Sequence, residues 1–309
     1  MTKPKMTKAK KGIFAAAITP IAANGEPNLK GLVDHCLYLL AAGCDGVAPL
    51  GTTGEAAALP YSFRMRTPEA LAKAEIPADA VILGAGSPSA GDAISVGKAS
   101  LAAGYFNLLM LPPYYTKDPD EEGIYDYYAR IIEAIDDPRL CLFLYHIPQM
   151  TGVAISVSLV ERLRASFGDI VAGVKDSSGS YTSAISYLKV ENLDVYPSSE
   201  AVLSDALREG CAGVISGTTN ISCDLAQRVL KAAGADRAAL QTKLSQIRQA
   251  IQRFPLIPAV KQLHAWRSGD PGWLRMAPPL RALSAEQTEG LKLAVSTLGL
   301  LDTSEALGQ

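Results

Sequence analysis

Two apolar stretches, LCLFLY at 140–145 and IVAGV at 170–174, decide the fold class of this chain. Both are continuously apolar rather than alternating, which is typical of parallel strands that are buried on both faces. Similar short runs recur and are followed by Gly, Pro, Thr or Ser, at 13–18, 46–50, 80–83, 105–111, 193–196 and 213–215. Helical patterns separate them, among others at 29–42, 90–103, 121–135, 156–166 and 200–209.

This alternation predicts eight βα units, and hence an α/β fold of the (β/α)8 or TIM barrel class, over residues 12–235. A doubly wound sheet usually has fewer strands. After residue 220 the strand signals stop, and helical patterns follow at 238–254, 257–268 and 284–298, with a proline-rich linker at 270–279. We therefore expect residues 236–309 to form a C-terminal helical annex that packs on the barrel and serves subunit contacts.

Composition narrows the class of protein further. The chain has 309 residues, 48% of them hydrophobic, which is enough for a full core and excludes disorder. A net charge of −2 argues against nucleic acid as a partner, and no apolar run is long enough to cross a membrane. The five cysteines are scattered, as in reduced cytoplasmic proteins. The basic residues 1–11 precede no apolar segment, so we expect a flexible, solvated leader on a cytoplasmic enzyme.

In a barrel of this class the working residues follow the carboxyl ends of the strands. Lys175 comes directly after the apolar run 170–174, so its amine emerges from a buried strand. Burial favours the neutral, nucleophilic amine, which forms a Schiff base with a ketone. The alternative is a solvated lysine that merely marks the end of a strand.

Residues on neighbouring strands fit this chemistry. Tyr145 ends the strand before that of Lys175, so its phenol is placed to move protons beside the amine; otherwise its ring simply fills the barrel. The turn Gly-Thr-Thr-Gly at 51–54 offers backbone N–H groups, together with the hydroxyls of Thr52 and Thr53, for a small carboxylate. Taken alone, that turn is equally consistent with an ordinary loop.

The sequence predicts no metal and no cofactor apart from a covalent imine at Lys175. The three histidines, His35, His146 and His264, are far apart and lack the spacing of metal ligands.

Five motifs occur in order: GTTGE at 51–55, PYY at 113–115, YHIP at 145–148 with TG at 151–152, GVKD at 173–176, and GVIS at 213–216. Through them, nearly the whole chain resembles the dihydrodipicolinate synthase/N-acetylneuraminate lyase family of pyruvate-dependent class I aldolases. The resemblance implies a TIM barrel, an imine between pyruvate and Lys175, and a homotetramer built as a dimer of dimers.

The resemblance also implies roles for individual residues. Tyr145 matches the catalytic phenol of the family, and Thr52 the hydroxyl that links it to a second tyrosine. That second tyrosine matches Tyr115, which in the family reaches into the active site of the neighbouring subunit. Thr52 and Thr53 match the residues that hold the pyruvate carboxylate, and Ile215 matches a residue of the pyruvate pocket.

The chain also departs from the family pattern. Met150 occupies the position where the synthases carry an arginine for the carboxylate of the second substrate, and this favours an aldolase. His146 replaces an asparagine, and the segment 59–68 lacks the usual acidic pair. Glu200, after the seventh strand, matches a region that contacts substrate hydroxyls in the sialic-acid lyases; alternatively, it is a charge at a helix N-terminus.

The sequence therefore predicts a class I lyase that uses or releases pyruvate and acts on a 2-keto-3-deoxy acid. The close alternative is dihydrodipicolinate (4-hydroxy-tetrahydrodipicolinate) synthase, which condenses pyruvate with aspartate semialdehyde. The synthase alternative becomes the better interpretation if His146 or Arg281 supplies the cation for the semialdehyde carboxylate that Met150 cannot supply. A third possibility is a non-catalytic barrel that binds a pyruvate-like ligand. In each case the partners are small molecules.

Overall fold

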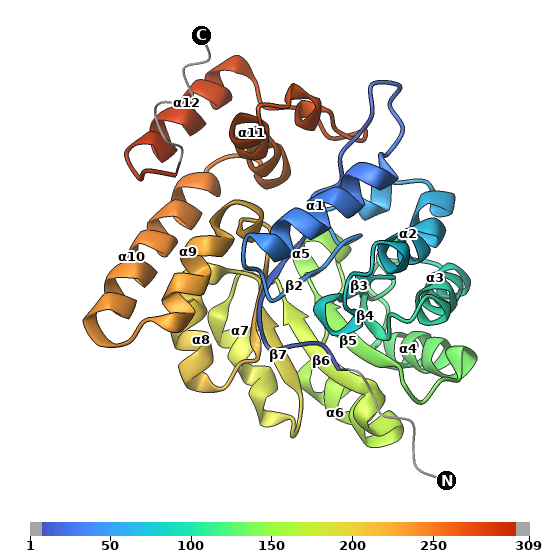
Figure 1. The fold of residues 1–309 in the computed structure, drawn as a ribbon. Helices are drawn as coiled ribbons and strands as arrows, with labels where there is room; N and C mark the ends of the chain where they lie inside the picture. The colour runs from blue at the N-terminus through green and yellow to red at the C-terminus, as the bar shows by residue number, and fades with distance from the viewer. Residues whose placement is uncertain (1–7, 301–309) are drawn as a thin grey trace.

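Eight parallel strands form the centre of the molecule in the computed structural model, which describes residues 8–300 (Figure 1). The strands are β1 (Gly12–Ala15), β2 (Gly46–Val47), β3 (Leu83–Gly84), β4 (Asn107–Met110), β5 (Cys141–His146), β6 (Val171–Asp176), β7 (Asp194–Pro197) and β8 (Gly213–Ser216). They pair in the order β2-β1-β8 and β3-β4-β5-β6-β7. A parallel bridge between Val47 and Val81 joins the two groups at one seam. A hydrogen bond of 2.9 Å from the Ala212 amide to the Val195 carbonyl joins them at the other. The predicted TIM barrel is confirmed.

Helices surround the strands, mostly where the sequence predicts them. The outer helices are α1 (Leu29–Ala41), α2 (Tyr61–Lys73), α3 (Ala90–Ala102), α4 (Glu121–Ile135), α6 (Val157–Phe167), α7 (Tyr181–Ser186), α8 (Leu203–Glu209) and α9 (Thr219–Lys231). A short helix, α5 (Pro148–Thr151), lies in the loop after β5. Polar side chains cap several N-termini: Asn28, Ser89, Asp120 and Ser156 each accept a hydrogen bond from the first turn. Within residues 8–300, no helix combines the length and apolar character needed to cross a bilayer.

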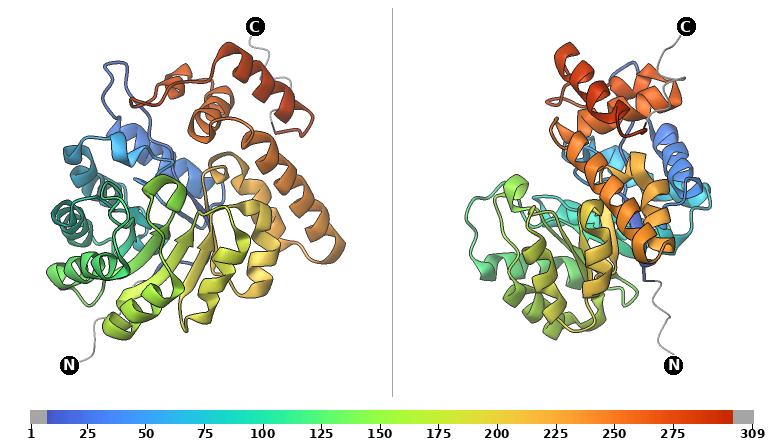
Figure 2. Two further views of the ribbon diagram at one scale, coloured as in Figure 1. Left: turned by 180° about the vertical axis from the view of Figure 1, so that it is seen from behind. Right: turned by 90° about the vertical axis from the view of Figure 1, so that its left-hand side faces the viewer.

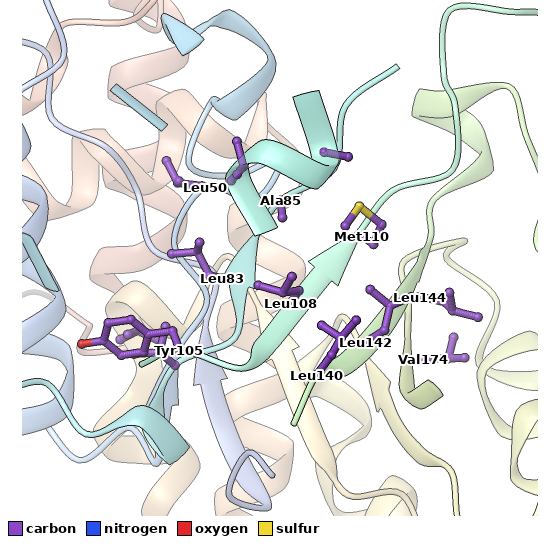
Figure 3. Packing of buried hydrophobic residues seen from close by; sticks show 14 of the residues in the cluster. Leu50, Leu83, Ala85, Tyr105, Leu108, Met110, Leu140, Leu142, Leu144 and Val174 are labelled. Atoms are coloured by element: carbon purple, nitrogen blue, oxygen red, sulfur yellow. The ribbon is translucent and has the colours of Figure 1, made fainter. Parts of the chain in front are cut away.

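The side chains of each strand divide between two cores. Leu142 and Leu144 of β5 belong to the buried cluster that also contains Ile131 and Leu159 of the outer helices. Figure 3 shows both leucines beside Leu108 and Val174 of the neighbouring strands. Phe143 and Tyr145 belong to the cluster inside the barrel. There the Phe143 ring contacts the Tyr196 ring at 6.0 Å between centroids. Burial on both faces explains why these strands are continuously apolar in the sequence.

The C-terminal annex consists of α10 (Gly234–Ile251), α11 (Leu256–Ser268) and α12 (Ala285–Ser296). Figures 1 and 2 show α10 beside α9, with α11 and α12 at the end of the molecule away from residue 8. Its core is continuous with the barrel, since one buried cluster contains Ile13 and Val214 of the strands together with Leu244, Leu263 and Leu291 of the annex. The predicted boundary between 235 and 236 therefore falls inside α10 and does not separate two cores.

The prediction of a flexible leader at 1–11 is wrong for residues 8–11, while residues 1–7 lie outside the described part. The amide of buried Ala9 donates to Asn107 Oδ1 at 2.9 Å, and the Tyr196 hydroxyl donates to the Lys10 carbonyl at 2.9 Å. Lys8 Nζ lies 2.7 Å from Asp194, whose side chain is almost fully buried at the start of β7. These basic residues are ordered because a buried carboxylate needs a counter-charge.

Candidate active site

Lys175 and Tyr145 lie side by side inside the barrel. The parallel register of β5 and β6 pairs Tyr145 with Lys175, and the Lys175 Nζ lies 4.2 Å from the centroid of the Tyr145 ring. Lys175 is only 3% exposed and belongs to β6 itself, so the alternative of a solvated lysine at a strand end is wrong. The arrangement brings a primary amine and a phenol into one buried space.

The Tyr145 hydroxyl is linked to the loop after β2. It donates to Thr52 Oγ1 over 3.3 Å. Burial by itself raises the pKa of Tyr145, but the positive charge of Lys175 and hydrogen bonds with Thr52 and Ser177 outweigh burial and lower the pKa. A phenol with a lowered pKa gives up and recovers its proton more readily, as a group that moves protons near neutral pH must.

The loop that carries Thr52 is held in an uncommon backbone conformation. Leu50 and Glu55, at its two ends, have φ values of 59° and 61°, in the left-handed region that non-glycine residues rarely adopt. Such residues persist where the surrounding structure fixes them. Here the Glu55 carboxylate is completely buried, forms an ion pair with Lys261 of α11, and accepts a hydrogen bond of 2.8 Å from the Ala277 amide.

A cavity of about 310 Å³ opens above these groups at the carboxyl ends of the strands. Of the residues that the sequence singles out, Thr52, Thr53, Tyr145, Met150, Lys175 and Ile215 line this cavity. Gln149, Ser177, Ser198 and Arg248 also line it. A neighbouring, mostly apolar cavity of about 260 Å³ shares Thr52, Tyr145 and Met150 and extends past Tyr114.

The chemistry available in the larger cavity is that of an amine, a phenol and several hydroxyls. Two cationic side chains, Lys175 and Arg248, line it without a carboxylate. Within residues 8–300, no group of three His, Cys, Asp or Glu residues is arranged to hold a metal ion. The site therefore suits a negatively charged substrate with a ketone that the amine can attack.

Comparison with known proteins agrees with this geometry. The profile of the Dihydrodipicolinate synthetase family matches residues 9–298. The chain belongs to this family. Its members are lyases of the class I aldolase type, and this chain is a lyase of that family.

Curated relatives and solved structures of the family are similar over most of the chain. A protein described as an uncharacterized DapA-like lyase from Chloroflexus aurantiacus is 34% identical, covering 92% of this chain and 95% of its own length. A 4-hydroxy-tetrahydrodipicolinate synthase from Pelobacter propionicus is 33% identical over 68% of this chain and 71% of its own. The crystal structure of dihydrodipicolinate synthase from Agrobacterium tumefaciens superposes with a TM-score of 0.85 at 31% identity, covering 94% of this chain and 100% of that one.

Two residues that the family resemblance singles out lie at the surface of the single chain. Tyr115, on the loop after β4, is 84% exposed. Within residues 8–300 it forms no hydrogen bond with Thr52 or Tyr145. Met150, on α5, is 64% exposed and lines the cavity with its thioether side chain. Both side chains are uncharged, so neither supplies a cation to the cavity.

The prediction that Glu200 contacts substrate hydroxyls is wrong. Its side chain is completely buried and does not line the cavity. Its carboxylate accepts hydrogen bonds from Ser216 (2.6 Å), Ser222 (3.0 Å) and Thr218. It is the first residue of the short 3₁₀-helix Glu200–Val202, and all of its contacts are internal. The carboxylate of Glu200 therefore contacts protein donors and not the cavity.

Neither His146 nor Arg281 lines either of the two cavities, so neither supplies there the cation that position 150 lacks. His146 Nδ1 accepts the Ile155 amide at 3.0 Å, and its Nε2 lies 3.9 Å from Asp176. Burial lowers the pKa of His146, with Asp176 acting in the opposite direction. Arg281 is exposed.

The cavity instead contains Arg248, from α10 of the annex, which sequence reasoning missed. No local motif marks this residue, because its place depends on how a distant helix packs. For Ser177 and Gln149 the sequence offers a weak indication of a place at the site. Ser177 follows the strand of Lys175, and Gln149 follows the strand of Tyr145.

Proposed function

We propose that this protein is a Schiff-base-forming lyase that cleaves a 2-keto-3-deoxy acid and releases pyruvate, or runs the reverse condensation. The observation that carries the proposal is the buried Lys175 amine beside Tyr145, whose hydroxyl reaches Thr52 at the floor of a cavity without carboxylates. A barrel that only bound a pyruvate-like ligand would have no use for a nucleophilic amine next to a phenol whose pKa is lowered.

The first half of the reaction forms the imine. Backbone N–H groups of Thr52 and Thr53 hold the substrate carboxylate, and Ile215 packs against the carbon chain. The Tyr145 phenolate first takes a proton from the Lys175 ammonium. The resulting Lys175 amine attacks C2 of the keto acid, and the carbonyl oxygen takes up the proton that the attacking nitrogen loses, which gives a carbinolamine. Loss of that hydroxyl as water, with a proton supplied through Tyr145, leaves a cationic imine on Lys175.

The second half breaks the carbon–carbon bond. Tyr145, as phenolate, accepts the proton of the C4 hydroxyl, and the C3–C4 electron pair moves into the imine, which becomes an enamine. An aldehyde leaves. Protonation of C3 from Tyr145 restores the imine, and water hydrolyses it to pyruvate and the free Lys175 amine. Thr52 holds the phenol in place through each proton transfer.

The nature of the second substrate rests on the residues at the mouth of the cavity. Met150 has no donor, so it favours a substrate other than the one that synthases bind through an arginine at this position. The alternative, condensation of pyruvate with aspartate semialdehyde, is supported by the relatives described as 4-hydroxy-tetrahydrodipicolinate synthases. A panel of aldehydes and keto acids, assayed for pyruvate release or consumption, separates the two.

We further infer that the working form is a homotetramer in the cytoplasm. The exposed ring of Tyr115, 84% of which is uncovered in one chain, fits a residue that completes the site of a neighbouring subunit. All five cysteines are buried and unpaired, which suits a reducing compartment.

Borohydride trapping tests the proposal. Treatment with pyruvate and borohydride should add the mass of one reduced pyruvate adduct, which peptide mapping should place on Lys175. Lys175→Ala should abolish both the label and turnover, whereas Lys189→Ala, at an exposed lysine, should change neither. Tyr145→Phe should lower kcat by about 10²- to 10⁴-fold. A label that persists in Lys175→Ala would overturn the assignment.

A further inference from the structure

The cavity contains a cation that the imine chemistry does not use. Arg248 reaches it from α10, and only 13% of its side chain is exposed. Its Nη1 donates to Ser216 Oγ at 3.0 Å and to Thr218 Oγ1 at 2.9 Å. Both N–H groups of Nη1 are therefore committed to protein acceptors.

The Ser216 and Thr218 hydroxyls that accept from Arg248 in turn donate to the buried carboxylate of Glu200. Ser216 Oγ donates to Glu200 at 2.6 Å, and Thr218 Oγ1 donates to the other carboxylate oxygen. The Arg248 Nη1 and the Glu200 carboxylate themselves are 3.7 Å apart. Glu200 thus compensates the guanidinium charge while the hydroxyls stay between the two groups. As a result, the arginine is held in one orientation without a ligand.

The other edge of the guanidinium remains available. Its Nε is 3.5 Å from Gln252 Oε1, a weak contact. No protein group between residues 8 and 300 accepts a hydrogen bond from its Nη2. A guanidinium donates most strongly to an ionised oxygen acceptor such as a carboxylate.

We propose that Arg248 binds a carboxylate at the far end of the substrate. This rests on the proposed function: the pyruvate half is held at Lys175 and Thr52, and Arg248 then selects among aldehydes. The substrate would be a 2-keto-3-deoxy acid with a second, terminal carboxylate, and the aldehyde half would carry that acid group. Arg248 thereby supplies the hydrogen-bond donors that Met150 lacks, from a different element of the fold.

Charge distinguishes a carboxylate from a phosphate at this position. Glu200 already compensates one positive charge, so the guanidinium offers directed donors without a large excess of positive potential. One free nitrogen suits one carboxylate oxygen, whereas a dianionic phosphate needs more donors and more charge. An uncharged aldehyde would leave the Nη2 donors without an acceptor, which is unfavourable in a partly dry cavity.

The test compares two aldehydes of similar length, succinic semialdehyde and pentanal, as acceptors for pyruvate, with glyceraldehyde 3-phosphate as a third. The wild-type protein should give a higher kcat/KM with succinic semialdehyde than with either of the others. Arg248→Gln should lower the ratio of kcat/KM for the acid to that for pentanal by about 10- to 100-fold. Arg253→Gln, which removes an exposed charge close to the end of α10, should leave the ratio unchanged.

A second variant guards against misfolding. Arg248→Gln leaves Glu200 buried without its partner, whereas the double variant Arg248→Gln/Glu200→Gln keeps a neutral hydrogen-bonded network. Both should still form the borohydride-trapped pyruvate adduct, which reports on Lys175 and so separates this inference from the proposed function. An unchanged acid-to-pentanal ratio in the folded double variant, or a wild-type preference for pentanal or for the phosphorylated aldehyde, would overturn it.

Discussion

Two buried acid–base pairs flank the mouth of the barrel, and they use their charges differently. Glu55 and Lys261 form a direct ion pair in which both side chains are completely buried. Backbone groups satisfy the rest of each: the Ala277 amide donates to Glu55, and Lys261 donates to the Arg275 carbonyl at 3.0 Å. Glu200 and Arg248 are instead linked through the hydroxyls of Ser216 and Thr218, to which both hydrogen-bond, and Arg248 also lines the cavity.

The difference separates a structural pair from one that can also recognise a ligand. In the direct pair both charged groups face protein partners, so its effect is to fix the loop 50–55 against α11 and the segment after it. Burial lowers the pKa of Lys261, and the charge of Glu55 partly reverses this. In the hydroxyl-linked pair, both carboxylate oxygens of Glu200 accept hydrogen bonds from protein hydroxyls. Arg248 still has N–H groups without a protein acceptor among residues 8–300, so it keeps donors for a substrate.

Breaking the direct pair should have the largest effect on stability. Lys261→Met leaves the Glu55 carboxylate buried without a counter-charge, and removing one partner of a buried pair costs about 3–5 kcal/mol. Urea unfolding should show a loss of this size. The double variant Glu55→Gln/Lys261→Met should recover most of it, because the introduced amide has no charge to compensate and its oxygen can still accept from the Ala277 amide.

The hydroxyl-linked pair provides the contrast. Arg248→Gln should destabilise the fold by clearly less than Lys261→Met, because three hydroxyls still donate to Glu200. Urea unfolding of the two variants side by side measures the difference. Equal losses in the two single variants would show that the distinction between the pairs is wrong.

Acid should act on a third group of buried polar residues, which has no counter-charge. His35 and His264 contact each other with 4.6 Å between ring centroids, and both pack on Trp273. Burial, and then the nearby His264, lowers the pKa of His35 to about 3, against a hydrogen bond with Asn220 that raises it. Burial, and then Arg267, lowers the pKa of His264 to about 4.

Below about pH 6.5 both histidines therefore become protonated in the unfolded chain, whereas in the folded chain they stay neutral until the pH approaches their lowered pKa values. Stability is fully present above that pH and should fall as the pH drops toward the folded values, by about 1.4 kcal/mol per pH unit for each histidine. Urea unfolding at pH 7.5 and pH 5 measures the effect. His264→Gln should show a clearly smaller drop between the two pH values; an equal drop would mean that other groups cause the acid sensitivity.

The smallest effect is expected at the opposite end of the barrel. Lys8 forms an ion pair with Asp194, and its side chain is 38% exposed. Lys11 Nζ also lies 3.4 Å from the Asp194 carboxylate, so Lys8→Gln leaves that acid a counter-charge and should cost only about 0.2–1 kcal/mol in urea unfolding. Raising the salt concentration should shrink the difference from wild type, since partly exposed pairs are screened. A loss as large as that of Lys261→Met would show that exposure does not set the scale of these pairs.

The sequence by itself determined the barrel and the neighbouring positions of Lys175 and Tyr145. Continuous apolar runs mark strands that are buried on both faces, and a lysine and a tyrosine at the ends of consecutive runs become neighbours because parallel strands share one end of the barrel. The helix at 121–135 begins and ends where the pattern predicts: the Asp120 side chain caps its N-terminus, and Asp136, in the left-handed conformation, ends it. These features depend on local pattern and on a regular topology.

Only the tertiary structure decided the roles of Glu200, Arg248 and residues 8–11. Glu200 follows a strand, as a site residue would, but three hydroxyls and an arginine from other elements enclose it. Arg248 lies on a surface-like helix in the sequence and enters the cavity because α10 packs against α9. Lys8 has a place because Asp194 is buried far along the chain. In each case a charge finds its partner across a long sequence separation, which no local pattern records.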